Sequence, residues 1–344
     1  MTTGLIDALV AQARRAPQRI VLPEVDDERI VMTARAMADR QIAVPLLLGS
    51  RKVVDATADA AGVDVGDIAV LDPADPVLVE DVIAAYLSLS DRLTEKTLRR
   101  KVRTPLNLAC ALAVTGHADA VAAGRTFSTS DVILAAQLMI GMQPGVQTVS
   151  STGILEIPGY AGSEGELLAI ADCAVCANPG PAELADIAAA TATTVSDLLG
   201  WEPRVAMLSF STKGSGDDPI VTKVIEAVDL LHQRVPDLFV DGELQLDAAI
   251  DPGVAGRKVP GDSPVAGRAN VLIFPDLNAG NIGVKLVQQF AHAVAHGPVL
   301  QGFAAPVTDF SRGAPVEEML GAIAIVAVRA QRQATRRDAR PVSP

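Results

Sequence analysis

Arg204-Val205-Ala206-Met207-Leu208-Ser209-Phe210 is a short apolar run that leads into a loop of small polar residues at 211–216. A helical pattern follows over 218–233, and a second apolar run extends from Leu238 to Asp241. A strand, a loop, a helix and another strand in this order predict a right-handed crossover between two parallel strands. This stretch therefore indicates an α/β fold with a parallel sheet.

The same alternation continues toward both ends of the chain. Strands are predicted at 19–23, 43–49, 68–71, 118–123, 149–157 and 271–275. Helices are predicted at 5–15, 29–40, 76–103, 106–115, 181–199, 280–296 and 315–333. The segment 251–268 holds many Pro and Gly residues, and we predict an ordered surface loop there.

Length and composition limit the kind of protein. The chain has 344 residues, about twice the usual length of one domain, and 49% of them are hydrophobic. The most apolar stretch near the C-terminus, Met319–Val328, has about half of the ~20 residues that a membrane span needs. The N-terminal residues show no pattern of a secretory signal. We therefore expect two globular domains and no membrane partner.

Charge and cysteine content limit the partners and the compartment. The formal net charge is −12, and only 3% of the residues are aromatic. Such a chain repels a polyanion and has few rings on which bases could stack, so a nucleic acid partner is not expected. Small anions fit a local cluster of Arg and backbone N–H groups. Three cysteines without a disulfide spacing indicate a reducing compartment, and we predict a cytoplasmic protein.

Two motifs that could bind metal or carry redox chemistry have simpler explanations. His292 and His296 lie four residues apart, but Ala293 stands where the metalloprotease pattern needs Glu. We interpret them as partly exposed histidines on a helix. Cys173 and Cys176 form a CxxC pair without a second pair, and the residues between them suit a core segment. We therefore predict no metal site.

The loop after the first quoted strand contains Lys213-Gly214-Ser215-Gly216. Small residues in succession can expose backbone N–H groups to an anion at the start of the next helix. A plain turn between a strand and a helix explains the same residues equally well. We include Lys213 and Gly214 among the candidate substrate-binding residues.

Three further loops carry polar groups directly after predicted strands or before a helix. Asp241–Asp247 spaces three carboxylates and an amide, and Phe274–Gly283 includes Asp276 and Asn281. Asp309-Phe310-Ser311-Arg312-Gly313 places a hydroxyl and a guanidinium just before the last helix. Loops after parallel strands gather at the carboxyl edge of the sheet, where ligands bind. An Arg at a helix start offers a fork of donors that suits phosphate.

These motifs occur together in one known family. The matching stretches are Ile20–Glu24, Asp27–Arg29, Val205–Ser215, Pro236-Asp237, Asp241–Asp247, Ser263–Gly267, Ala269–Gly283, Gly297-Pro298 and Asp309–Gly313. With them the chain resembles the phosphate acetyltransferases (phosphotransacetylases), within the phosphate acetyl/butyryl transferases. The resemblance covers nearly the whole chain, and its motifs are longest in the C-terminal half.

The resemblance implies a fold and a reaction. The fold would be two three-layer α/β domains with parallel-rich sheets and an interdomain cleft, with domain 2 (148–298) inserted into domain 1 (1–147 and 299–344). The reaction would be the reversible conversion of acetyl-CoA and phosphate into acetyl phosphate and CoA, by direct thiolate attack in a ternary complex. The resemblance also implies a homodimer without a tightly bound cofactor, with CoA, acetyl-CoA, acetyl phosphate and inorganic phosphate as its small-molecule partners.

The resemblance assigns catalytic roles to three residues. The family's Ser-Arg pair falls on Ser311 and Arg312. Arg312 would hold the phosphoryl group and offset charge as the carbonyl becomes tetrahedral, and Ser311 would bond the thiol or the carbonyl oxygen. The family's general base is an Asp six residues after this Arg, where the chain has Glu318. Glu318 would take the proton of the CoA thiol.

The implied CoA site departs from the family pattern. Thr129, Ser130 and Asp131 match a family stretch that is followed by an Arg in contact with CoA, but 132–135 is Val-Ile-Leu-Ala. A second CoA-linked Arg of the family falls near Leu89. Arg125, just before this stretch, could restore part of the contact with the phosphates of CoA. We therefore include Arg125 in the predicted substrate-binding set.

Two other hypotheses stay open beside acetyl transfer. The protein could act on a larger acyl group such as butyryl, which would keep the same phosphate chemistry. It could also be a catalytically weak family member with a role in binding or regulation. The presence of Ser311, Arg312 and the carboxylate loops disfavours a catalytically weak protein, whereas the missing CoA arginines favour it.

Overall fold

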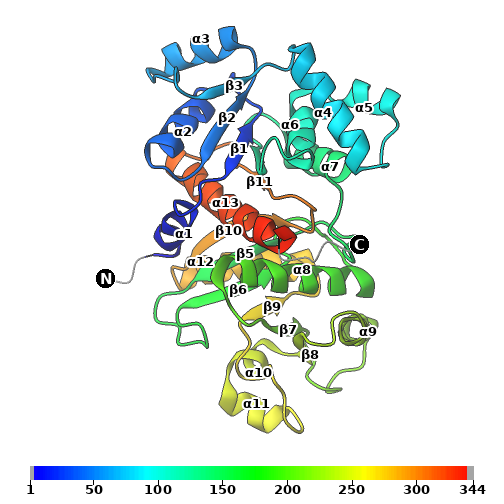
Figure 1. Cartoon of the computed structure of the whole chain (residues 1–344). Helices are drawn as coiled ribbons and strands as arrows, with labels where there is room; N and C mark the ends of the chain where they lie inside the picture. Colours follow the sequence, from blue (N-terminus) through cyan, green and yellow to red (C-terminus); the bar gives the residue numbers. More distant parts are fainter. Residues whose placement is uncertain (1–3, 339–344) are drawn as a thin grey trace. The chain divides into compact units, whose positions relative to one another are not determined.

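The computed structural model describes residues 4–338, and its helices and strands form two units (Figure 1). Unit 1 combines the residues up to Gly141 with those from Phe303 onward, and unit 2 consists of Met142–Gly302. Unit 2 is thus inserted into the chain of unit 1. The chain passes from one unit to the other after Gly141 and after Gly302, whereas the resemblance implies crossings after 147 and 298.

Unit 1 is built on a sheet of five parallel strands in the order β11-β4-β1-β2-β3. The strands are β1 (Arg19–Leu22), β2 (Val44–Leu48), β3 (Ala69–Leu71), β4 (Ala120–Ala123) and β11 (Val307–Asp309). Ile20, Val21 and Leu22 of β1 are completely buried. A parallel strand that is covered on both faces is a continuous apolar run, which is why its sequence predicts it well.

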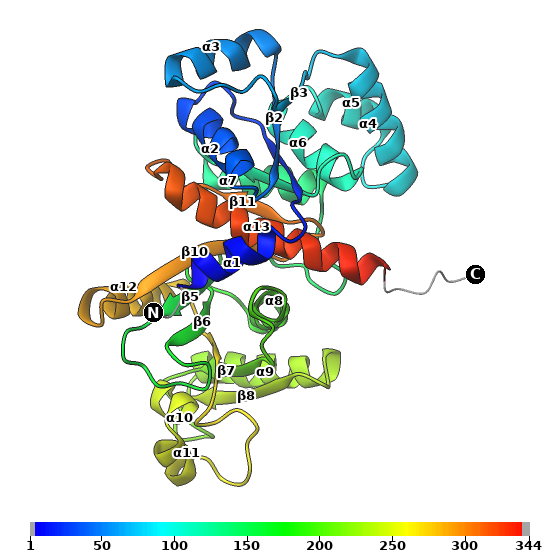
Figure 2. The same cartoon turned by 60° about the vertical axis from the view of Figure 1, so that its left-hand side comes forward.

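Helices cover both faces of this sheet (Figures 1 and 2). α13 packs against α1 and α2 on one face, whereas α6 and α7 lie together on the other. The helices of unit 1 are α1 (Leu5–Ala13), α2 (Glu28–Asp39), α3 (Arg51–Ala61), α4 (Pro76–Leu89), α5 (Glu95–Lys101), α6 (Pro105–Val114), α7 (Thr129–Met139) and α13 (Val316–Asp338). None of the helices in the described part of the chain is both long and apolar enough to cross a bilayer.

Unit 2 has a mixed sheet of six strands in the order β10-β5-β6-β9-β7-β8. β10 and β5 pair antiparallel, as do β5 and β6, and the other pairings are parallel. The strands are β5 (Ser150–Glu156), β6 (Leu167–Ala171), β7 (Arg204–Leu208), β8 (Phe239–Leu244), β9 (Val271–Ile273) and β10 (Val294–Gln301). α8 and α9 share one hydrophobic core with the sheet, and α10 and α12 contribute to another. These helices are α8 (Pro181–Leu199), α9 (Pro219–Arg234), α10 (Leu246–Ile250), α11 (Pro252–Lys258) and α12 (Leu277–Phe290).

The structure corrects three of the predicted elements. The helical region 76–103 is two helices, α4 and α5, because the chain turns extended at Ser90. The predicted surface loop 251–268 begins with α11, whose Asp251 caps the backbone N–H groups of its first turn. The predicted helix 280–296 ends at Phe290, where the chain changes direction and continues as the edge strand β10.

Gly280 fixes how α12 packs within unit 2. It is the buried residue of this helix, and a Cβ built there would lie 2.1 Å from the backbone oxygen of Asp172. Helical Gly256 of α11, by contrast, is exposed and has nothing within 4 Å of a Cβ. The two glycines therefore differ in packing, although both lie in helices.

We expect Gly280→Ala to lower the free energy of unfolding by roughly 1–3 kcal/mol, because the backbone of the neighbouring loop must move. Gly256→Ala should raise it by about 0.5–1 kcal/mol, since alanine restricts the unfolded chain without a clash. Urea denaturation of both variants measures the two changes. Equal changes in the two variants would contradict this account of α12 packing.

Candidate active site

Three loops meet at the carboxyl edge of the sheet in unit 1. They follow β1, β4 and β11, which are neighbours in the sheet. The sequence-predicted residues of unit 1 lie on these loops or on the helices that begin there: Arg125, Thr129, Ser130, Asp131, Ser311, Arg312 and Glu318. The topology thus brings together residues that are almost two hundred positions apart in the chain.

The turn that carries Ser311 and Arg312 is fixed through its backbone. The Ser311 carbonyl accepts hydrogen bonds from the Ala314 N–H at 3.0 Å and from Arg125 Nη1 at 3.4 Å. Arg29 Nη1 donates to the carbonyls of Gly313 and Ala314 at 3.2 and 3.3 Å. Ser311 and Arg312 themselves are exposed. The backbone of the turn is therefore anchored while the two side chains face solvent.

Arg312 carries an uncommitted positive charge. No residue in the described part of the chain forms a hydrogen bond or ion pair with its guanidinium. Hydrogen bonds from Ser128 lower the pKa of the Asp131 carboxyl, and burial raises the pKa of the Asp309 carboxyl; at both, the charge of Arg312 is a smaller effect in the lowering direction. An unpaired guanidinium on a turn with a fixed backbone can donate hydrogen bonds to two oxygens of a phosphate.

Arg125 lies inside unit 1, against the prediction that it reaches CoA. Its side chain is 9% exposed, and its Nη2 forms an ion pair with Asp27 Oδ2 at 3.0 Å. The Nη1 atom holds the Ser311 carbonyl, so both ends of the guanidinium face protein groups. A direct contact of Arg125 with the phosphates of CoA is therefore not supported, and its geometry indicates a role in holding the Ser311 turn.

Thr129 and Asp309 link the start of α7 to the end of β11. The Thr129 hydroxyl donates to Asp309 Oδ2 at 2.6 Å, and Asp309 Oδ1 is buried without a partner among the described residues. Burial raises the pKa of the Asp309 carboxyl, the Thr129 hydroxyl opposes this, and the charge of Glu24 adds to the rise. Ser128 and Asp131 form a capping box at the start of α7. The Asp131 carboxylate therefore already accepts hydrogen bonds within this cap.

Gly124 allows the β4 loop to approach β11 this closely. Its φ is +110°, and a Cβ there would lie 2.2 Å from Asp309 Oδ1 and 2.7 Å from the Phe310 nitrogen. A side chain at this position would separate the two loops.

Sequence reasoning missed Glu24 as a residue of this site. Its carboxylate follows β1, is 1% exposed and accepts hydrogen bonds from the loop after β4. The signal in the sequence was an acidic residue directly after the apolar run that ends at Pro23. Its partners lie one hundred positions away, so no local pattern could name them.

Glu318 lies in the first turn of α13 and is exposed. Its neighbour Glu317 forms an ion pair with Arg40, and this contact lowers the pKa of the Glu317 carboxyl. No residue in the described ranges binds the Glu318 carboxylate. Of these two glutamates, Glu318 is the one free to accept a proton from a ligand.

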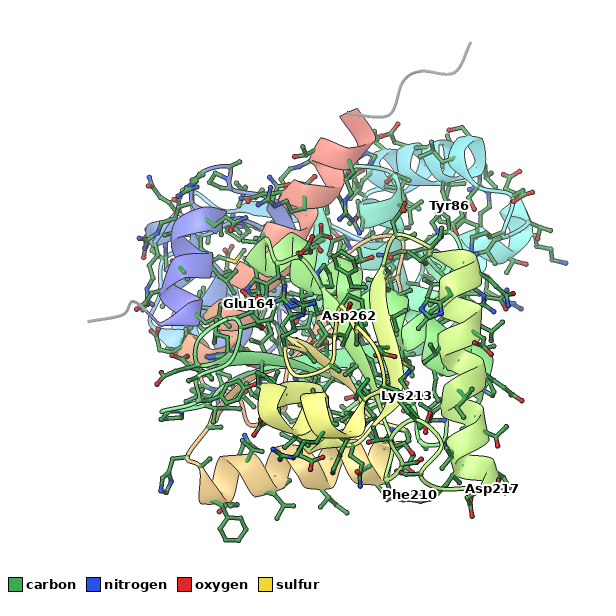
Figure 3. All side chains as sticks on the ribbon, turned by 90° about the horizontal axis from the view of Figure 1, so that it is seen from below. Tyr86, Glu164, Phe210, Lys213, Asp217 and Asp262 are labelled. Atoms are coloured by element: carbon green, nitrogen blue, oxygen red, sulfur yellow. The ribbon has the colours of Figure 1, made fainter. Side chains whose placement is uncertain are left out.

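Lys213, which Figure 3 labels, and its neighbour Gly214 lie on the loop between β7 and α9 in unit 2. Lys213 Nζ binds Asp241 Oδ1 at 2.5 Å and the Gly242 carbonyl at 2.7 Å. The Gly214 N–H donates to Glu243 Oε1 at 2.7 Å. The predicted anion nest therefore holds the protein's own Glu243 carboxylate, which is 3% exposed. Binding of a substrate anion by this pair is not supported by these contacts.

Asp276 and Asn281 lie at the start of α12, after β9. The Asp276 side chain caps the helix by accepting the Ala279 N–H at 2.9 Å. Asn281 Nδ2 donates to the Cys173 carbonyl at 3.3 Å. β7 and β9 are neighbours, so this pair and the Lys213 loop share one edge of the unit 2 sheet, although no hydrogen bond joins them.

The histidine and cysteine pairs of the sequence analysis lie in unit 2. The expectation that both histidines lie on a helix is wrong: His292 follows α12 with a φ of 55°, and His296 lies in β10, where its Nε2 is 3.1 Å from Glu156 Oε2. Burial raises the pKa of Cys173 and of Cys176 to about 11, so both are thiols near neutral pH. Within residues 4–338, no three metal-binding side chains gather.

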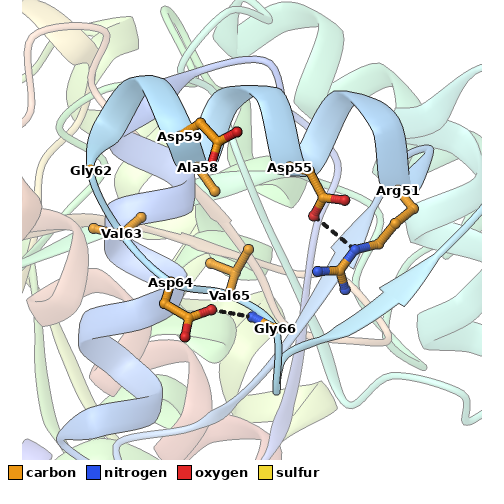
Figure 4. A pocket seen from close by; sticks show the side chains of 9 residues that line it. All are labelled: Arg51, Asp55, Ala58, Asp59, Gly62, Val63, Asp64, Val65 and Gly66. Atoms are coloured by element: carbon orange, nitrogen blue, oxygen red, sulfur yellow. Dashed lines mark hydrogen bonds and ion pairs between the residues drawn. The ribbon is translucent and has the colours of Figure 1, made fainter.

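Unit 1 also has a surface hollow of about 550 Å³ beside the end of α3 (Figure 4). Three of its polar side chains are already paired: Arg51 with Asp55 at 2.8 Å, and Asp64 with the Gly66 N–H at 2.8 Å. None of the predicted site residues lines it. The hollow therefore gives no support for a second ligand site.

Comparisons with known proteins identify the family of the chain. The family described as phosphate acetyl/butaryl transferase matches residues 4–327. A phosphate acetyltransferase of Clostridium acetobutylicum is 41% identical over 330 residues, which cover 95% of this chain and 99% of that protein. One of Thermoanaerobacterium thermosaccharolyticum is 40% identical over 330 residues, which cover 95% of this chain and all of that protein. The crystal structure of a phosphotransacetylase from Streptococcus pyogenes has a TM-score of 0.85 at 35% identity and covers 95% of this chain and 98% of its own. The chain therefore belongs to the phosphate acetyl/butaryl transferase family and is an acyltransferase.

Proposed function

We propose that the protein is a phosphate acetyltransferase that exchanges an acetyl group between CoA and inorganic phosphate through Ser311, Arg312 and Glu318. The activity is supported by relatives of that name at 40–41% identity over 95% of the chain. The observation that carries the assignment of residues is the exposed, unpaired guanidinium of Arg312 on a turn whose backbone is held by Arg125 and Arg29.

The proposed reaction needs three groups. In the direction of acetyl-CoA, the thiol loses its proton to Glu318 and the sulfur attacks the carbonyl carbon of acetyl phosphate. A bond between sulfur and carbon forms, the bond between carbon and the phosphate oxygen breaks, and phosphate leaves. Arg312 offsets the charge on the phosphoryl group throughout, and this help increases as negative charge develops in the transition state. Ser311 donates a hydrogen bond to the carbonyl oxygen.

The binding of CoA is the part in which this chain departs from the family pattern. Leu89 and Leu134 lie in the two stretches where the resemblance implies arginines, and each is 63% exposed. A leucine cannot pair with a phosphate, so CoA loses charge-assisted contacts there. A larger acyl group such as butyryl, or a weak family member with a binding role, remains the alternative to acetyl transfer. A panel of acyl-CoAs with phosphate separates these cases.

We propose that the protein acts as a homodimer in the cytoplasm. Ile282, Leu286 and Phe290 are 57%, 50% and 82% exposed and recur every four residues along α12, so they form one apolar face. An exposed apolar face of this kind is typical of an interface, and we propose that a second copy covers it.

The proposed cytoplasmic location is supported by the three unpaired cysteines, which a reducing compartment keeps as thiols. Recovery of the protein from a secreted fraction would contradict it.

Arg312→Ala and Arg312→Lys should each lower the turnover of acetyl-CoA with phosphate by about 100-fold or more, because the phosphate loses a two-pronged charged contact in the transition state. Thiol release and acetyl phosphate formation measure this rate. A wild-type protein that releases no thiol with any acyl-CoA of the panel would remove the proposed function, and normal turnover in either variant would remove Arg312 from it.

Glu318→Gln should lose most of the turnover near pH 6–7, and the loss should shrink toward pH 9. A free thiol with a pKa of about 8.5 ionises by itself as the pH rises, so the missing base matters less. The kcat for the formation of acetyl-CoA from CoA and acetyl phosphate, measured from pH 6 to 9, tests this. Glu317→Gln is the matched control, because Glu317 is committed to Arg40 and should have near-normal turnover. A loss that stays constant over the whole range would point to a structural role of Glu318.

Phe290→Asp should convert the dimer to a monomer, because a charge buried in an apolar interface is costly. Sedimentation or light scattering gives the mass directly. Val77→Asp is the control, since Val77 of α4 is also an apolar side chain, 75% exposed, but lies in unit 1. An unchanged mass in Phe290→Asp would show that α12 does not form the interface.

A further inference from the structure

Five hydrogen bonds converge on the carboxylate of Glu24. Oε2 accepts the N–H groups of Gly124 at 2.8 Å and Arg125 at 3.1 Å. Oε1 accepts the N–H groups of Thr126 at 2.5 Å and Phe127 at 2.9 Å, and the Thr126 hydroxyl at 2.7 Å. Four consecutive backbone N–H groups therefore point at one side chain from another part of the chain.

This arrangement makes the loop after β4 dependent on one negative charge. Consecutive N–H groups that point inward form a site for an anion. Here the anion is a side chain that is 1% exposed, so water cannot replace it. A buried carboxylate without these donors, or the donors without an acceptor, would each be costly. Glu24 and the loop 124–127 therefore hold each other in place.

Two side chains transmit the position of this loop to the candidate catalytic turn. Arg125 belongs to the loop, and its guanidinium bridges Asp27 and the Ser311 carbonyl. Thr129 follows the loop directly, and its hydroxyl binds Asp309 at the end of β11. The residue before Arg312 is thus tied to a loop whose path Glu24 determines.

We propose that Glu24 is a positioning residue for acyl transfer, which sets the place of Ser311 and Arg312 through the loop 124–127 and Arg125. This inference rests on the proposed function of that pair. Glu24 is too deeply buried to touch a substrate, so its effect is on geometry. A displacement of a reacting group by about 1 Å can lower a rate by about 100-fold.

Glu24→Gln tests the proposal with almost no change in volume. The amide must turn an NH₂ group toward N–H donors, so at least two of the five hydrogen bonds are lost. We expect the amides of 124–127 to exchange hydrogen faster, as measured by mass spectrometry on the full chain. We also expect kcat to fall by about 100-fold at a temperature where the variant is folded, with a smaller change in the KM for acetyl-CoA.

Asp186→Asn is the matched control. Asp186 is also a buried carboxylate, 5% exposed. It accepts the N–H groups of Gln147 and Thr148 at 2.8 and 3.1 Å, the Thr148 hydroxyl at 3.0 Å, and a charged hydrogen bond from Arg234 Nη1 at 3.0 Å. It lies in unit 2, so its loss should lower Tm by a similar amount and leave kcat within about two-fold. Equal falls of kcat in the two variants would mean a general loss of stability and would overturn the positioning role.

Arg125→Lys separates the anchoring of the loop 124–127 by Glu24 from the contact of Arg125 with the Ser311 turn. The backbone N–H groups of the loop still reach Glu24, so the amides of 124–127 should stay protected, whereas a lysine cannot bridge Asp27 and Ser311 and kcat should fall at least ten-fold. If Glu24→Gln fails to fold, this variant decides alone. Wild-type kcat in Arg125→Lys, or normal protection and normal kcat in Glu24→Gln, would overturn the proposal. Absence of acyl transfer in the wild type would instead remove the proposed function, while hydrogen exchange would still report on the loop.

Discussion

A buried carboxylate at the end of a strand is the interaction on which both units depend. A loop that passes over the edge of a parallel sheet brings its N–H groups out of water, and each of them needs an acceptor. Glu24 supplies it after β1, Asp172 after β6 and Glu243 within β8. Asp172 receives the N–H groups of three consecutive residues, as Glu24 receives four. The free-energy cost of burying these carboxylates is thus offset by hydrogen bonds from loop N–H groups that would otherwise have no acceptor.

The same interaction decides which groups are left for a ligand. Backbone sites that could hold a phosphate are filled by the protein's own carboxylates, because Glu243 occupies the loop at Gly214 and Glu24 the loop at Gly124. Arg125 and Lys213 are also committed to acidic partners. Arg312 differs from them, because only its backbone turn is anchored. Of the three basic residues Arg125, Lys213 and Arg312, internal ion pairs therefore leave Arg312 without an acidic partner among the described residues of a strongly acidic protein.

The sequence predicted those helices and strands whose ends are marked by nearby residues such as Pro and Gly and whose buried residues form an apolar pattern. α8 was predicted from 181 to 199, and it begins at Pro181 and ends before Gly200, which has a φ of 68°. β10 was missed because an edge strand with Gly297-Pro298 inside it lacks an apolar run, and α11 was missed because its glycines are typical of loops. In the candidate site, Ser311 and Arg312 could be predicted from one motif. The partners of Glu24 and Arg125 could not, since they depend on which strands become neighbours.

The order of the chain gives the insertion of unit 2 a consequence for biosynthesis. β4 is complete at Ala123, but its neighbour β11 is not made until Val307–Asp309. At a synthesis rate of about 5–20 residues per second, the edge of β4 waits roughly 10–40 s for its partner strand. Unit 2 has all of its own strands by then and can fold first. The nascent chain thus carries an open sheet edge for most of its synthesis, and chaperones that recognise unpaired strands have that interval in which to act.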